Sequence, residues 1–234
     1  MPKRESSHVE RVARARNAAP QATGWSAKRA LAAALRELLA HLPNTAAPEA
    51  ELRALEPALR EAAARFAAAG RAEVAAGAPP VFPGMEHFHE TGPLVGLSNP
   101  LAPPLELRID VEARVIRARG RFGNAYEGAP GILHGGFLAA AFDEILGMAT
   151  VFSGGPGMTR ELNVRYLRPT PIDVDVEFVG RLDRTEGRRI FVSAEALAGG
   201  LRTALASGVF TSVDGEKFEA FQEARRERQS RRPA

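Results

Sequence analysis

Hydrophobic and polar residues alternate over much of the second half of the chain. In residues 173–178, Val and Phe alternate with acidic residues, and in residues 161–166, Leu, Val and Tyr alternate with polar ones. A period of two is typical of strands that bury one face in a core. A turn is predicted at Glu186-Gly187. Four more strands are predicted, at residues 105–110, 112–122, 189–197 and 202–213. The pattern therefore predicts a sheet that is largely antiparallel.

One segment interrupts this β pattern. Residues 135–152, with the sequence GGFLAAAFDEILGMATVF, are too long for an ordinary strand and are apolar on nearly every side. A helix of that composition has to be buried. A sheet with one solvated face, wrapped around this single helix, satisfies both patterns. We therefore predict an α+β fold in which a central helix supplies much of the core.

Two amphipathic helices are predicted ahead of the sheet. The first covers residues 26–42, where leucines recur on one face, Ser26 is suited to cap the start and Pro43 ends the helix. The second lies between Pro48 and Gly70. Together they are predicted to form a helical hairpin. The second helix carries an apolar stripe that consists of Leu52, Leu55, Leu59, Ala63 and Phe66.

A stretch rich in Pro and Gly, residues 77–104, separates the helices from the sheet and is typical of an irregular connection. We divide the chain into a helical extension over residues 1–80, a main domain over residues 93–214 and a basic tail over residues 215–234. The net charge is only +3, but Arg and Lys crowd both ends. We interpret these basic ends as solvated and in part disordered rather than as a surface for polyanions.

Composition excludes several kinds of chemistry. The 234 residues contain no cysteine, which excludes disulfides, thiolate metal sites and cysteine nucleophiles. His87 and His89 share a strand-like spacing, but without a clear third ligand no metal site is predicted. The polar, basic N-terminus is not followed by an apolar run of signal-peptide or membrane-spanning length. We therefore expect a cytoplasmic protein that does not insert into a membrane.

Two carboxylates distinguish the predicted central helix. Asp143 and Glu144 are its only charged residues, and burying an unpaired carboxylate costs roughly several kcal/mol. A functional role would justify one of them. We therefore take Asp143 as the candidate catalytic carboxylate and interpret Glu144 as structural.

The start of the same helix carries candidate hydrogen-bond donors. Around His134, Gly135 and Gly136, the glycines let backbone N–H groups approach a ligand at the positive end of the helix dipole. Such donors suit the oxyanion of acyl transfer, and a carboxylate that activates water completes the parts for thioester hydrolysis. Gly136 and Asp143 are seven residues apart, which is about 10 Å along a helix. We therefore predict a site shared by two subunits.

Two segments give the chain a specific resemblance to a known family. They are YEGAPGILHGGFLAAAFDEILG, residues 126–147, and TRELNVRYLRPTP, residues 159–171. Over residues 93–214 the chain resembles the PaaI-like, acyl-CoA thioesterase branch of the hot-dog superfamily. The resemblance implies a hot-dog fold, which is an antiparallel sheet wrapped around a central helix, here with an N-terminal helical extension.

By position, the resemblance implies a role for each matched residue. Asp143 matches the catalytic acid of the family, acting as general base or nucleophile, and Thr159 matches the hydroxyl residue that holds the water. Gly135 matches the oxyanion donor, with His134 beside it. Some relatives carry an Asn ahead of the HGG motif that helps to polarise the thioester, whereas this chain has residues 127–130, EGAP, in that region.

The predicted function is hydrolysis of an acyl-CoA to the free acid and CoA. Asp143 and Thr159 are the predicted catalytic residues, and the backbone N–H groups of Gly135 and Gly136 form the predicted oxyanion hole, beside His134. No cofactor is expected apart from the CoA of the substrate. The expected assembly is a homodimer, or a higher homo-oligomer built from it. The residue pattern does not determine the acyl group.

Two other functions stay open at this point. A hot-dog hydratase or dehydratase would need a catalytic His facing a helix carboxylate, and His134 is the one candidate for that role. An acyl-CoA sensor would join a hot-dog domain to a DNA-binding module. The first 80 residues are basic and helical but show no clear helix-turn-helix pattern, so nucleic acid is not an expected partner.

Overall fold

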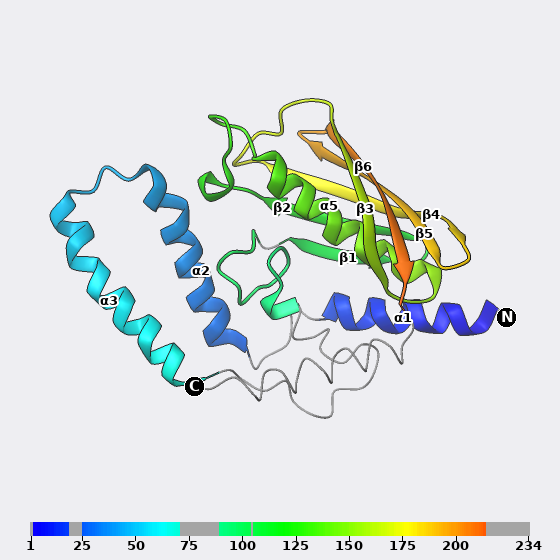
Figure 1. Ribbon diagram of the computed structural model, residues 1–234, viewed down its shortest axis with the longest axis horizontal. Helices are drawn as coiled ribbons and strands as arrows, with labels where there is room; N and C mark the ends of the chain where they lie inside the picture. Colours follow the sequence, from blue (N-terminus) through cyan, green and yellow to red (C-terminus); the bar gives the residue numbers. More distant parts are fainter. Residues whose placement is uncertain (1, 19–24, 71–88, 104, 214–234) are drawn as a thin grey trace.

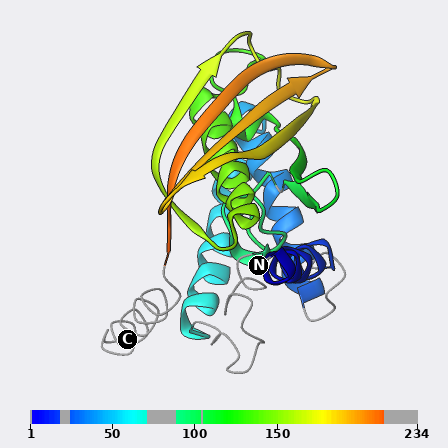
Figure 2. The same cartoon turned by 90° about the vertical axis from the view of Figure 1, so that its right-hand side faces the viewer.

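The fold is built on a six-stranded antiparallel sheet. The computed structural model describes residues 2–18, 25–70, 89–103 and 105–213. The strand order is β1-β2-β4-β5-β6-β3. Figure 1 shows α5 lying along one face of the sheet, and Figure 2 shows the sheet curving around that helix. The helices are α1 (Pro2–Ala18), α2 (Ser26–His41), α3 (Glu49–Ala68) and α5 (Gly135–Ala149). The strands are β1 (Glu106–Asp110), β2 (Val115–Arg121), β3 (Gly157–Tyr166), β4 (Asp175–Glu186), β5 (Arg189–Ala198) and β6 (Leu201–Ser212).

Helix α5 is the centre of the core, which confirms the predicted α+β architecture. It continues into a 3-10 turn, Thr150–Ser153. By length and composition Gly135–Ser153 would suffice to cross a membrane, but half of this apolar stretch is buried inside the protein. It is therefore the core helix that the sequence pattern predicts. Its buried side chains are Leu138, Ala141, Phe142, Ile145, Leu146 and Ala149.

The helix packs tightly on β4, where the alternating pattern is confirmed. Val176 and Phe178 are buried, and the Phe178 ring meets the Phe142 ring edge-on at a centroid distance of 5.6 Å. At Gly180 a Cβ would lie 2.7 Å from the Cγ2 of Ile145, which is closer than two carbons can pack. A glycine at this position therefore allows the helix to lie close to the sheet.

Strand β3 forms one edge of the sheet. It pairs with β6 and, among the described strands, with no other. The predicted alternation holds in part, because Leu162 and Val164 pack against the core while Tyr166 is 52% exposed. The edge position explains the difference, since an edge strand lacks a neighbour on its outer side.

The structure corrects the prediction for the start of the chain. Residues 2–18 form α1, which packs against β1 and the 3-10 turn after α5. Val9, Val12 and Ala13 are buried in the same core as the sheet residues. The sequence pattern did not predict this contact, because only a few apolar residues stand among the basic residues of this segment.

The two helices of the predicted hairpin are present, and much of their apolar stripes is exposed. Figure 1 shows α3 outermost, with α2 between it and the rest of the molecule. On α3, Leu55 is 43% exposed and Phe66 is 59% exposed, and no residue of this helix is buried. The apolar stripe of α3 therefore contributes nothing to the core of the single chain.

The segment that joins the extension to the sheet is described from residue 89 to residue 103. There it lies between α2 and the sheet, as Figure 1 shows. The predicted boundary near residue 80 and the predicted tail over residues 215–234 lie outside the described residues.

Candidate active site

Asp143 and Thr159 meet beside the exposed edge of the sheet. Asp143 lies in the middle of α5, and Thr159 lies near the start of β3. The Thr159 hydroxyl donates a hydrogen bond to Oδ1 of Asp143 at 2.9 Å. Thr159 is exposed and Asp143 is half-buried, so water can reach the pair. The β3–β6 register shifts between Thr159 and Glu161, an irregularity of the kind that turns side chains toward active sites.

The other end of the predicted site is the start of α5, where His134 is the N-cap residue. Its ring Nδ1 accepts a hydrogen bond from the N–H of Gly136 at 3.0 Å. Because Nδ1 is the acceptor, the neutral ring carries its proton on Nε2. The exposed imidazole can therefore donate from Nε2. The predicted Gly136 donor needs a correction, since its N–H is already engaged inside the protein.

The N–H of Gly135 is the backbone donor that remains. Gly135 is the first residue of α5, and no described residue accepts a hydrogen bond from its N–H. The Tyr166 hydroxyl donates to the Gly135 carbonyl at 2.8 Å, and a Cβ on Gly135 would lie 3.3 Å from that hydroxyl. The missing side chain thus permits a close approach to Tyr166. The Gly135 N–H lies at the positive end of the helix dipole, where a negative oxygen is favoured.

Two tyrosines that the sequence analysis left without a role hold this helix start. Tyr166 contacts Gly135 as described above. The carbonyl of Tyr126 accepts the N–H of His134 at 2.9 Å, and its ring meets the Phe137 ring edge-on at 5.0 Å. Both tyrosines lie within the two segments that carry the family resemblance, which was the signal available to find them.

Glu127, in the EGAP segment ahead of the HGG motif, holds the turn before His134. Its Oε1 accepts the N–H of Gly131 at 2.5 Å. Gly131 has a φ of 75°, a backbone conformation that glycine adopts at little cost. Glu127 therefore closes the turn ahead of His134.

Glu144, beside Asp143, lies in a more enclosed setting. Burial raises the pKa of Glu144 to about 7, with Arg16 opposing the shift and the Asp143 carboxylate adding to it. Arg16, on α1, is 5% exposed, and burial lowers its pKa to about 10. Arg16 is therefore still positively charged at neutral pH. Helix α1 thus places a buried positive charge near the middle of the candidate catalytic helix.

Residues suited to metal binding are not grouped in the part of the chain that the structure describes. There, no three His, Asp or Glu side chains are arranged to hold a metal ion. His89 is buried, and His87 lies outside the described residues.

Taken within one chain, the two halves of the predicted site are far apart. Gly135 and Asp143 are eight residues apart on one continuous helix, so about 12 Å separates their backbones. One thioester carbon therefore cannot contact both. The antiparallel sheet curved around one long helix, with a polar helix start and an acidic residue in its middle, is the hot-dog arrangement.

Comparison with known proteins shows which family this domain resembles. Residues 130–205 match the family model of the thioesterase superfamily. Over these residues, the hot-dog domain of this chain therefore resembles the thioesterase superfamily. A crystal structure described as a thioesterase superfamily protein superimposes with a TM-score of 0.70 and 28% identity. That match covers 79% of this chain and 90% of the other.

Curated relatives resemble part of the chain. An acyl-coenzyme A thioesterase from Bos taurus, THEM4, is 38% identical over 97 residues, which are 41% of this chain and 40% of that protein. The human acyl-coenzyme A thioesterase THEM5 is 37% identical over 98 residues, 41% of this chain and 39% of that protein. The matched region thus spans about two fifths of each curated relative.

Proposed function

We propose that this protein hydrolyses an acyl-CoA thioester to the free acid and CoA. The observation that carries the proposal is the hydrogen bond from Thr159 to Asp143, in a domain of the thioesterase superfamily. The acyl-CoA thioesterases among its relatives support the substrate class. The unengaged N–H of Gly135 supplies the electrophilic donor that this reaction needs.

Each proposed step has a residue with suitable chemistry. The Thr159 hydroxyl donates a hydrogen bond to Asp143, so its oxygen can accept a hydrogen bond from a water that also donates to the carboxylate. Asp143 takes a proton as the water oxygen bonds to the thioester carbon. The N–H of Gly135 and Nε2–H of His134 stabilise the oxyanion. The C–S bond then breaks, and the proton on Asp143 passes to the CoA thiolate.

A homodimer is part of the proposal. The 12 Å separation along α5, estimated from the rise of a helix, calls for Gly135 of one chain and Asp143 of another at each site. The outer edge of β3, where Thr159 lies, pairs with no other described strand and offers a surface on which a second copy can bind. Two equivalent sites per dimer follow from such an arrangement.

Thiol release from a panel of acyl-CoAs tests the activity directly. The purified protein is incubated with short, long and aromatic acyl-CoAs, and free CoA is followed with a thiol reagent. We expect turnover that differs across the panel and so identifies the acyl class. The steps above need no metal or added cofactor, so a chelator should leave the rate unchanged. Binding of acyl-CoA without any thiol release would contradict the proposal and favour a sensor.

Substitution of Thr159 by Val tests the role of its hydroxyl. Val has nearly the same shape but cannot hold the water, so kcat is expected to fall about tenfold with a smaller change in KM. Thr159→Ser retains the hydroxyl and serves as the matched control, with kcat close to that of the wild type. Equal rates for the Val and Ser variants would show that Thr159 is a strand residue without a catalytic role.

A further inference from the structure

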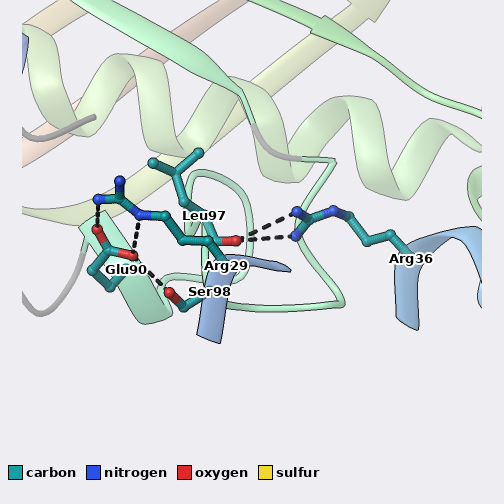
Figure 3. Close-up of polar contacts among 5 residues, drawn as sticks. All are labelled: Arg29, Arg36, Glu90, Leu97 and Ser98. Carbon is teal, nitrogen blue, oxygen red and sulfur yellow. Dashed lines mark hydrogen bonds and ion pairs between the residues drawn. The ribbon is translucent and has the colours of Figure 1, made fainter. Parts of the chain in front are cut away.

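Helix α2 is tied to residues 89–103 by two arginines, as Figure 3 shows. Arg29 pairs with Glu90 through two hydrogen bonds, and the Ser98 hydroxyl donates to the same carboxylate at 2.7 Å. The Glu90 side chain is 3% exposed. Burial alone would raise the pKa of Glu90, but the donors Arg29 and Ser98 lower it below its usual value. The pair therefore stays ionised and links helix to segment.

Arg36, two turns further along α2, donates hydrogen bonds to the backbone of the same segment. Its Nη1 donates to the carbonyl of Asn99 at 2.9 Å and to that of Leu97 at 3.3 Å. A guanidinium that bonds two neighbouring carbonyls restrains the path of the backbone as well as its position. The Asn99 side chain accepts a hydrogen bond from the N–H of Leu101 at 2.9 Å, which restrains the next residues of the segment as well.

From Leu101 the contacts lead to the start of α5. The Tyr126 hydroxyl donates to the Leu101 carbonyl at 2.8 Å. Burial raises the pKa of Tyr126 to about 12, so the phenol keeps the proton that it donates. The Tyr126 carbonyl accepts the N–H of His134, and His134 in turn caps Gly136. A continuous series of hydrogen bonds and covalent links therefore connects Arg36 to the oxyanion donors.

We propose that α2 and residues 89–103 form a brace that positions the donor end of α5, with Arg36 and Tyr126 as positioning residues. The inference rests on the proposed hydrolysis for its kinetic consequence. It assigns a task to the extension ahead of the hot-dog domain. Without the brace, the loop before His134 is held at fewer points, and the Gly135 N–H and the His134 ring sample a wider range of directions. Misdirected donors weaken stabilisation of the transition state more than binding of the substrate.

Kinetics of two single variants and their combination test the brace. Tyr126→Phe removes the hydroxyl, and Arg36→Gln removes the bidentate cation, while both keep most of the side-chain volume. We expect each to lower kcat about tenfold with KM changed less than about twofold. Both side chains act through one path. The kcat of the double variant should therefore be only slightly lower than that of the less active single variant. Arg36→Lys should regain part of the rate. Arg60→Gln, on the exposed face of α3, should match the wild type.

Hydrogen exchange of backbone amides supplies a readout that does not need activity. In Arg36→Gln and Tyr126→Phe, amides of residues 127–137 should exchange faster, while those of β4 and β5 should not change. Unchanged exchange in residues 127–137 would overturn the brace, as would variants that lower the melting temperature but keep the wild-type kcat. If the wild type hydrolyses no acyl-CoA, the proposed function fails, and faster exchange in the variants still supports the brace.

Discussion

Asp143→Asn is expected to lower kcat for acyl-CoA hydrolysis by about a thousandfold, because an amide cannot take a proton from water or attack the thioester. The amide oxygen can still accept the hydrogen bond from Thr159, so the fold and KM should change little. Steady-state thiol release, together with a thermal melt, measures both effects. Asp175→Asn is the matched control, because Asp175 is an exposed carboxylate on β4 that pairs with Arg119 of β2.

The same reaction can separate the two roles left open for Asp143. In a single turnover in water labelled with heavy oxygen, a general base leaves the label in the released acid alone. A nucleophile forms an anhydride with the acyl group, and its hydrolysis can leave the label in the Asp143 carboxylate. Wild-type rates in Asp143→Asn would exclude both roles and remove the central residue from the proposed mechanism.

Glu144→Gln is expected to stabilise the protein at neutral and alkaline pH. Burial raises the pKa of Glu144 from its usual value of 4.5 to about 7, against the opposing effect of Arg16. Between these two values the folded protein keeps a proton that the unfolded chain has released. The favourable contribution is therefore complete below about pH 4.5 and is lost as the pH rises through about 7. At about 1.4 kcal/mol per pH unit, the wild type loses about 3 kcal/mol relative to the Gln variant.

Chemical unfolding at several pH values measures this difference. The two proteins should have similar free energies of unfolding near pH 4.5, and the Gln variant should be more stable at pH 8. Other titrating groups cancel in the comparison because both proteins share them. Glu61→Gln, on the exposed surface of α3, controls for the loss of one carboxylate. A stability difference that is the same at both pH values would contradict the raised pKa.

The prediction from sequence worked best where local periodicity carries the information. The alternation in residues 173–178 identifies a strand, and the apolar run of residues 135–152 identifies α5, because both depend on neighbours two to four positions away. The same logic located α2 and α3, whose apolar stripes are largely exposed in the single chain. A stripe such as Leu52, Leu55 and Leu59 shows that a helix has an apolar face and leaves open whether anything covers it.

For the candidate site too, the sequence indicated some features and the structure was needed for others. Residue types and spacing identified Asp143, His134 and Gly135 as candidates, and the family resemblance added Thr159, which the structure places in contact with Asp143. The choice between the Gly135 and Gly136 amides was not accessible from spacing. It depends on the rotamer of His134, whose ring takes the Gly136 N–H for itself.

The sequence by itself determined the order of the helices and strands from α2 onward, the composition of the core helix and the residues with suitable chemistry. Only the tertiary structure decided that α1 joins the core, that Arg16 lies near Glu144 and that α2 reaches the start of α5 through residues 97–101. The physical reason is the separation along the chain. Arg36 and Asn99 are 63 residues apart, so their contact depends on how the whole chain packs rather than on local pattern.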